Sequence, residues 1–230
     1  MGAFFHLILT QPLLNILIWF YNVIPVQDMG LAIIALTVFI RLLLIPSFQK
    51  SLRSQKELQQ IQPKLDELRR QHKDDKEAQT KAILEFYKQH KVNPFSSCLP
   101  LLLQLPILIA LYRVFLVGLN GNIAGDLYSF IGNPGEINTN FLGLIDLQKT
   151  NLLFAFLAGG FQFVQSKMIA PPAGLAPKDK TASLMSAQFT YFMPILTVII
   201  AMRLPAGLSL YWVVTTLFAI AQQYYIMKKG

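Results

Sequence analysis

A single charge, Arg41, interrupts an apolar stretch of twenty residues that runs from Gly30 to Gln49. At a rise of 1.5 Å per residue, about 20 apolar residues cross the hydrocarbon core of a bilayer. The stretch therefore predicts a transmembrane helix with Arg41 near mid-depth, where a charge costs about 2.5–3.5 kcal/mol even on a lenient scale. Arg41 either snorkels to the cytoplasmic surface or forms the charged wall of a hydrated cavity within the membrane.

Amide side chains, rather than carboxylates, accompany this arginine. The other candidate spans contain no Asp or Glu, so Arg41 needs water, polar side chains or a partner from outside the chain. Gln162 and Gln165 are three residues apart and share one helix face. For each glutamine, hydrogen bonding between helices is the alternative role, and for Trp212 it is ordinary packing. The residues expected to line the cavity are Arg41, Gln104, Gln162, Gln165, Gln188 and Trp212.

The composition indicates a membrane protein without catalytic groups. The 230 residues are 53% hydrophobic and only 14% charged, and their mean hydropathy is +0.45. Soluble domains carry about 25% charged residues, so the deficit favours a polytopic membrane protein. Cys98 is the only cysteine, which excludes an internal disulfide. No Ser/His/Asp set, carboxylate pair or metal-ligand spacing occurs, so we expect neither an enzyme nor a cofactor.

The elements that must position these side chains form an all-α polytopic membrane protein with five transmembrane helices. An outer loop rich in Gly and Asn and a cytoplasmic loop join the spans, and a short cytoplasmic tail follows the last one. The expected spans are 30–49, 97–117, 151–169, 184–202 and 205–227, with the outer loop at 118–150, the cytoplasmic loop at 170–183 and the tail at 228–230.

Residues 1–25 are apolar and aromatic, and they are either a sixth span or an amphipathic helix in the outer interface. Gln11, Asn15 and Asn22 form a thin polar stripe, and Pro12 interrupts the run. Trp19 and its aromatic neighbours lie at one end, as in interfacial helices. A basic n-region and a small-residue cleavage site are both missing, which argues against a signal peptide. We expect the interfacial helix.

Residues 50–93 are the only extended polar region, and they predict a cytoplasmic hairpin of two antiparallel helices. In the first helix Pro63 is expected to cause a kink. Asp74, followed by Glu77, is expected to cap the second helix. The hairpin either receives substrate or a partner, or it only connects two spans. The apolar stripe of the first helix comprises Leu58, Ile61, Leu65 and Leu68.

The distribution of Lys and Arg predicts the orientation. Eleven of the twenty lie between residues 50 and 91, among seven acids, which is typical of a solvated domain and not of a nucleic-acid-binding patch. With this hairpin in the cytoplasm, sixteen of the twenty lie on the inner side. The outer ends carry Arg113, Lys149 and Arg203. The positive-inside rule then predicts an outer N-terminus and a cytoplasmic C-terminus.

Four motifs, in this order and spacing, closely resemble the YidC membrane protein insertase family, with its mitochondrial Oxa and chloroplast Albino relatives. The resemblance covers nearly the whole chain. The motifs are Ile40-Arg41-Leu42 with Pro46, the IQPKL run at 61–65, VNPFSSCLPLLLQLPILIALY at 92–112, and LPAGLSLYW with the later QQY at 204–224.

The resemblance implies insertion and folding of membrane proteins without nucleotide hydrolysis, by a protein of the bacterial cytoplasmic membrane. It implies five core spans, a cytoplasmic hairpin and an outer amphipathic helix. It also implies that Arg41 faces a groove open to cytoplasm and lipid and closed on the outside. Implied partners are nascent membrane proteins and the lipid bilayer, with the Sec translocon, the signal recognition machinery and the ribosome as further candidates.

The sequence departs in three respects from other members of the family it resembles, and these differences suggest a short bacterial form. No large outer domain precedes the core, Cys98 offers no N-terminal lipoprotein cysteine, and the chain ends two lysines past the last span. A ribosome tether through a basic tail is therefore not expected.

Two other functions compete with insertion. A small anion transporter or channel would use Arg41 as its selectivity charge, but we find no internal repeat of the kind that transporters show. A passive scaffold would use the hairpin for docking.

Overall fold

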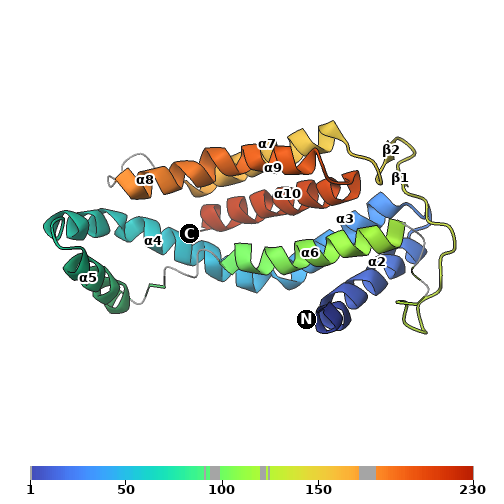
Figure 1. Cartoon of the computed structure of the whole chain (residues 1–230), viewed down its shortest axis with the longest axis horizontal. Helices are drawn as coiled ribbons and strands as arrows, with labels where there is room; N and C mark the ends of the chain where they lie inside the picture. The colour runs from blue at the N-terminus through green and yellow to red at the C-terminus, as the bar shows by residue number, and fades with distance from the viewer. Residues whose placement is uncertain are drawn as a thin grey trace.

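The computed structural model describes residues 2–90, 92–93, 99–119, 123, 125–170 and 180–229. This part of the chain is mostly helical, with the longer helices running along one axis (Figure 1). A helical pair lies at one end of the molecule, and the N-terminal helix and a small β ladder lie at the other.

The core is an apolar cluster between the helices at the end opposite the helical pair. Helix α10 packs against α3, α6 and α7, while α7 also packs against α9 and α2 against α3. Leu14, Leu36, Leu111 and Tyr211 are buried members of this cluster. The helices are α2 (Gln11–Val23), α3 (Met29–Leu43), α6 (Leu99–Leu119), α7 (Leu152–Ile169), α9 (Met193–Ala201) and α10 (Ala206–Lys229).

Short helical segments extend two of these helices toward their N-termini. The helix α1 (Gly2–Phe5) and a π-helical segment, η1 (His6–Thr10), lead into α2 without a break. The helix α8 (Lys180–Ala187) and a second π-helical segment, η3 (Gln188–Phe192), lead in the same way into α9. The predicted span 184–202 thus falls within one continuous helical run, and the predicted cytoplasmic loop lies largely outside the described residues.

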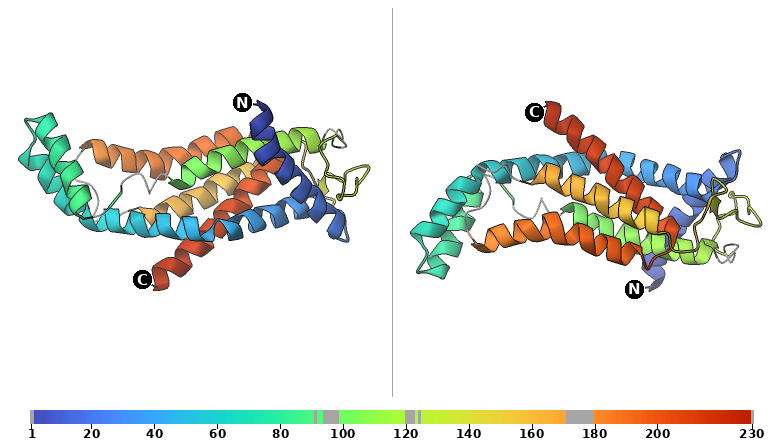
Figure 2. Two further views of the ribbon diagram at one scale, coloured as in Figure 1. Left: turned by 90° about the horizontal axis from the view of Figure 1, so that it is seen from below. Right: turned by 90° about the horizontal axis from the view of Figure 1, so that it is seen from above.

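Two described helical stretches are long and apolar enough to cross a membrane, or three if a bent pair counts as one span. The two are Ala3–Val23 and Leu152–Ile169, and the bent pair is α3 with α4 (Ile45–Gln71). Length and composition thus allow the first 23 residues to span. In the structure, however, this helix crosses the neighbouring helices obliquely at one end of the bundle (Figure 2).

The expected continuous helix over 30–49 is broken at Leu44. Helix α3 ends at Leu43, α4 begins at Ile45, and the two are bent by 62° relative to one another. The cause is Pro46, which has no N–H to donate to the carbonyl of Leu42 and whose ring clashes with the preceding turn. Residues 45–49 are therefore the start of the long helix α4 and not the end of α3.

Helix α4 continues through Pro63 as one helix, and α5 (Lys76–Gln89) folds back beside it (Figure 1). Gln79 Nε2 donates to the carbonyl of Arg69 across the pair, at 2.7 Å. Burial raises the pKa of Tyr87 on α5, and Arg69 opposes that rise.

The helix α5 is capped one residue later than expected. The carboxylate of Asp75, not that of Asp74, accepts from the N–H groups of Glu77 and Ala78, each at 3.0 Å. The prediction of Asp74 was wrong because Asp75 N–H still closes the preceding turn on the carbonyl of His72, which leaves Asp74 inside that turn.

The predicted outer loop, between α6 and α7, contains a two-stranded antiparallel ladder, β1 (Asn140–Phe141) with β2 (Ile145–Asp146). Leu142 and Gly143 turn between the strands with positive φ angles of 52° and 71°. The ring of Phe141 covers Gly30 on α3, where a Cβ atom would lie 2.1 Å from it. The loop is thus fitted closely against the first residues of α3.

Asp28 joins this loop to α3, and it gives a direct test of the fold. Its carboxylate, 1% exposed, accepts from Gly30 N–H at 2.7 Å, Leu31 N–H at 3.1 Å and Leu142 N–H at 2.6 Å. Asp28→Ala leaves three N–H groups without this acceptor, so we expect a loss of about 2–4 kcal/mol in the free energy of unfolding. Thermal unfolding in detergent measures it.

Glu136→Ala, at an exposed position of the same loop, is the control and should leave stability unchanged. Equal melting temperatures for Asp28→Ala and Glu136→Ala would contradict the structural role of Asp28.

Candidate functional site

Arg41 lies in the last turn of α3, just before the break, and its side chain is buried with 6% exposure. Its guanidinium Cζ lies 4.5 Å from the centroid of the Phe48 ring, which belongs to the first turn of α4. Among the described residues, Nη1 has no hydrogen-bond partner and no carboxylate forms an ion pair with Arg41. The main electrostatic feature of this region is therefore a buried cation whose Nη1 donor has no hydrogen-bond partner among the described residues.

Arg41, Gln104 and Tyr211 lie close to one another and come from three helices. Gln104 Nε2 on α6 donates to the Tyr211 hydroxyl on α10 at 2.6 Å. Tyr211 is 2% exposed and lies near Arg41 on α3, without a hydrogen bond between these two described residues. We call Arg41, Phe48, Gln104 and Tyr211 the arginine cluster.

The sequence prediction included Arg41 and Gln104 but missed Tyr211 and Phe48 as members of the cluster. For Tyr211 a signal existed, because it lies in the LSLYW motif with Thr215 four residues later, on the same helix face. For Phe48 a signal also existed, because it follows Arg41 by seven residues and i and i+7 lie on one face of a helix.

Helix α10 contributes Tyr211 to the arginine cluster and buries further polar residues. One of them, Thr216, donates its hydroxyl back to the carbonyls of Trp212 and Val213. Nearer the C-terminus, Gln222 Nε2 lies 3.4 Å from the carbonyl of Ile45 and joins α10 to the first residue of α4. The buried polar residues of α10 are Ser209, Thr215, Thr216 and Gln223.

Gln162, another of the predicted site residues, bonds to a neighbouring helix. The side-chain oxygen of Gln162 on α7 accepts from the Thr197 hydroxyl on α9. One turn earlier, Gly159 allows these helices to approach so closely that a Cβ there would lie 2.2 Å from Val198. Gln162 therefore joins α7 to α9.

No described contact connects Gln165, Gln188 or Trp212 to the arginine cluster. Gln165 is half-buried on α7, Gln188 is exposed at the start of η3, and Trp212 is half-buried beside Tyr211. A cavity-lining role for these residues stays a prediction.

At the end of the bundle near α4 and α5, single hydrogen bonds join neighbouring elements. Gln59 Nε2 on α4 donates to the carbonyl of Ile169, the last residue of α7. Lys167, two residues earlier on α7, donates to the Tyr191 hydroxyl at 2.7 Å. These are single, partly exposed hydrogen bonds between elements.

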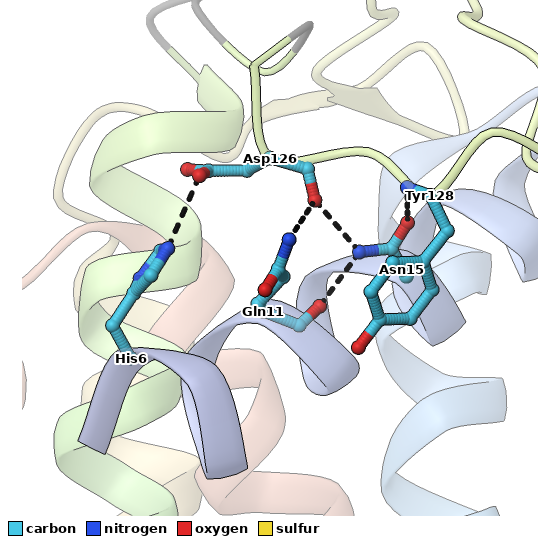
Figure 3. Close-up of polar contacts among 5 residues, drawn as sticks. All are labelled: His6, Gln11, Asn15, Asp126 and Tyr128. Carbon is cyan, nitrogen blue, oxygen red and sulfur yellow. Dashed lines mark hydrogen bonds and ion pairs between the residues drawn. The ribbon is translucent and has the colours of Figure 1, made fainter. Parts of the chain in front are cut away.

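At the opposite end of the bundle, a denser network joins α2 to the loop after α6 (Figure 3). Asn15 Nδ2 donates to the carbonyls of Asp126, at 2.9 Å, and Gln11, at 2.8 Å. Its Oδ1 accepts from Tyr128 N–H at 2.7 Å. Gln11 Nε2 also donates to the Asp126 carbonyl, and His6 Nε2 lies 3.1 Å from the Asp126 carboxylate. One asparagine thus satisfies three backbone groups.

The same loop is also bonded to the start of α10 and to the last turn of α2. The N–H groups of Ala206 and Gly207 donate to the carbonyls of Lys149, at 2.7 Å, and Leu147, at 3.1 Å. The Tyr21 hydroxyl accepts from Asn138 N–H at 2.8 Å. At this end of the bundle α2, α3 and α10 are therefore all bonded to one loop.

Comparisons with known proteins give one consistent result. The family model described as "60Kd inner membrane protein" matches residues 19–230. The chain is 35% identical over 229 residues to "Membrane protein insertase YidC" of Magnetococcus marinus, covering 99% of this chain and 36% of that protein. It is 33% identical over 205 residues to the protein of the same name from Fusobacterium nucleatum, covering 89% of each.

A third relative with that name, from Pelobacter propionicus, is 33% identical over 221 residues, which are 96% of this chain and 39% of the relative. The chain thus spans somewhat over a third of the Magnetococcus and Pelobacter proteins, but most of the Fusobacterium protein.

The hydrogen bonds of Asn15 predict a measurable difference between two asparagines of α2. Asn15→Ala leaves Tyr128 N–H and the Asp126 carbonyl short of a buried partner, so we expect a loss of about 1–3 kcal/mol in the free energy of unfolding. Asn22→Ala is the matched control, because its amide makes one exposed bond, to the Gly132 carbonyl at 2.7 Å. Thermal unfolding in detergent compares the two, and a larger loss for Asn22→Ala would contradict the network.

Proposed function

The chain belongs to the YidC family of membrane protein insertases, and on that premise we propose that it inserts and folds membrane proteins without catalysing a chemical reaction. We propose a hydrophilic groove open to the cytoplasm and to lipid, in which Arg41 attracts acidic residues of a substrate's outer tail. The observation that carries this proposal is the buried guanidinium of Arg41, whose Nη1 has no hydrogen-bond partner in the described residues.

The proposed topology has five spans in the bacterial cytoplasmic membrane, with the N-terminus outside and the C-terminus inside. The spans comprise α3 with the first turn of α4, then α6, α7, the α8–α9 run and α10. The oblique α2 lies in the outer interface, with Trp19 exposed. The inner excess of Lys and Arg supports this orientation.

The energetics of insertion explain why a groove that reaches only partway across the membrane is useful. A substrate must move a polar outer tail across the hydrocarbon core, and each charge at its centre is costly. Water that reaches Arg41 shortens the apolar distance, and the positive charge attracts carboxylates of the tail. The apolar segment then moves sideways into lipid, where burial of about 25 cal/mol per Å² drives it.

The helices α4 and α5 form the proposed receiving module on the cytoplasmic side. No described residue of α5 is fully buried, and Leu84 is 54% exposed. Nascent membrane proteins are the proposed substrates of this module, and the signal recognition machinery, the ribosome and the Sec translocon are proposed partners.

Closure of the outer end argues against the anion channel or transporter. A channel needs a continuous polar path, whereas the outer loop is bonded to α2, α3 and α10. We therefore favour insertion over ion flux.

Substitution of Arg41 tests the proposed attraction. Arg41→Lys keeps the charge and should retain insertion, while Arg41→Ala and Arg41→Glu should slow insertion of a single-span substrate with an acidic outer tail. We expect about fivefold or more for Arg41→Ala, which corresponds to roughly 1 kcal/mol of lost attraction. Protease protection of the tail in proteoliposomes measures the rate.

The control is the same substrate with a neutral tail, for which the three variants should differ little. Equal losses for both tails, in variants that remain folded, would assign Arg41 a structural role only.

A further inference from the structure

Arg41 and Phe48 contact each other across the break between α3 and α4. Phe48 follows Arg41 by seven residues, which along a straight helix is about two turns, on the same face, with an advance of about 10.5 Å. In the structure the two helices are bent by 62° at Leu44, and the guanidinium carbon lies 4.5 Å from the centroid of the Phe48 ring. The contact thus joins the last turn of α3 to the first turn of α4.

The geometry leaves the arginine able to bind a second group. The guanidinium carbon lies over the face of the Phe48 ring, and a guanidinium carries five N–H donors in its own plane. Nη1 is one of these donor nitrogens, and it has no partner among the described residues. A cation–π contact uses none of the acceptors that a hydrogen bond needs, so Nη1 can still donate to a carboxylate.

An aromatic ring also differs from a carboxylate in what it does to the charge. The ring quadrupole stabilises the buried cation, but it adds no negative charge of its own. A carboxylate in the same place would cancel the positive charge that an acidic substrate is attracted to. The stack thus holds a buried charge in position and leaves it available.

We propose that Phe48 is a positioning residue: its ring holds the guanidinium of Arg41 so that the free N–H edge receives acidic groups of the substrate. This inference rests on the proposed function of Arg41. Phe48 itself contacts Arg41 and not the substrate.

Fluorination of Phe48 tests the proposal, because it weakens the ring quadrupole stepwise with little change of shape. Phenylalanine with one, two and three ring fluorines is incorporated at position 48 of the full chain. The readout is the ratio of insertion rates for acidic-tailed and neutral-tailed substrates in proteoliposomes. We expect this ratio to fall with each fluorine, to a final loss of about two- to thirtyfold.

Two substitutions of Phe48 by standard amino acids and one control position complete the series. Phe48→Tyr keeps an electron-rich ring and should keep the ratio, while Phe48→Leu should lower it as far as trifluorination does. Fluorination of Phe156, which is exposed on α7, should change nothing. If Phe48→Leu does not fold, the fluorinated series alone remains decisive.

The outcomes separate this inference from the proposed function. A ratio that stays flat across the Phe48 series, while Arg41→Ala still lowers it, would overturn the role of Phe48 and leave that of Arg41 intact. A wild-type protein that inserts both substrates equally well would overturn the proposed function, and with it this inference.

Discussion

The structure depends on holding one buried positive charge without an ion-pair partner among the described residues. Burial of Arg41 without compensation would cost several kcal/mol, and the predicted spans offer no Asp or Glu to offset it. The face of the Phe48 ring lies against the guanidinium, and Tyr211, which is bonded to Gln104, lies nearby. The ring stabilises the cation but leaves its net charge intact.

The arginine cluster takes one residue from each of α3, α4, α6 and α10. The hydrogen bonding at the two ends of the bundle differs. At the end near the β ladder, buried side chains bond several backbone groups each, as Asn15 and Asp28 do. At the end near α4 and α5, single amides such as Gln59 and Gln222 join neighbouring helices. At about 0.5–1.5 kcal/mol each, these single hydrogen bonds cost less to break than the network at the other end. This difference supports the proposed opening toward the cytoplasm.

Much of this account follows from the sequence, because an isolated charge in an apolar run and amides in neighbouring runs are visible without a structure. Arg41 and Gln104 were found in this way. Contacts between helices could not be predicted in this way, since periodicity assigns a residue to a helix face but does not say which helix that face meets. Thus Thr197 and Tyr211 became apparent only as partners of Gln162 and Gln104. Pro46 was visible, yet the break that it causes depends on local backbone geometry, as does the shift of the α5 cap from Asp74 to Asp75.

The central claim is that water reaches Arg41 from the cytoplasm alone, and side-specific labelling of cysteines tests it most directly. In a background with Cys98 replaced, single cysteines are placed at Gln104, Trp212 and Thr215 in oriented membrane vesicles. A charged, membrane-impermeant thiol reagent should label them when supplied from the cytoplasmic side and leave them unlabelled when supplied from outside. Labelling from both sides would indicate a pore, and labelling from neither would mean that the protein seals Arg41 from water; either result contradicts the account.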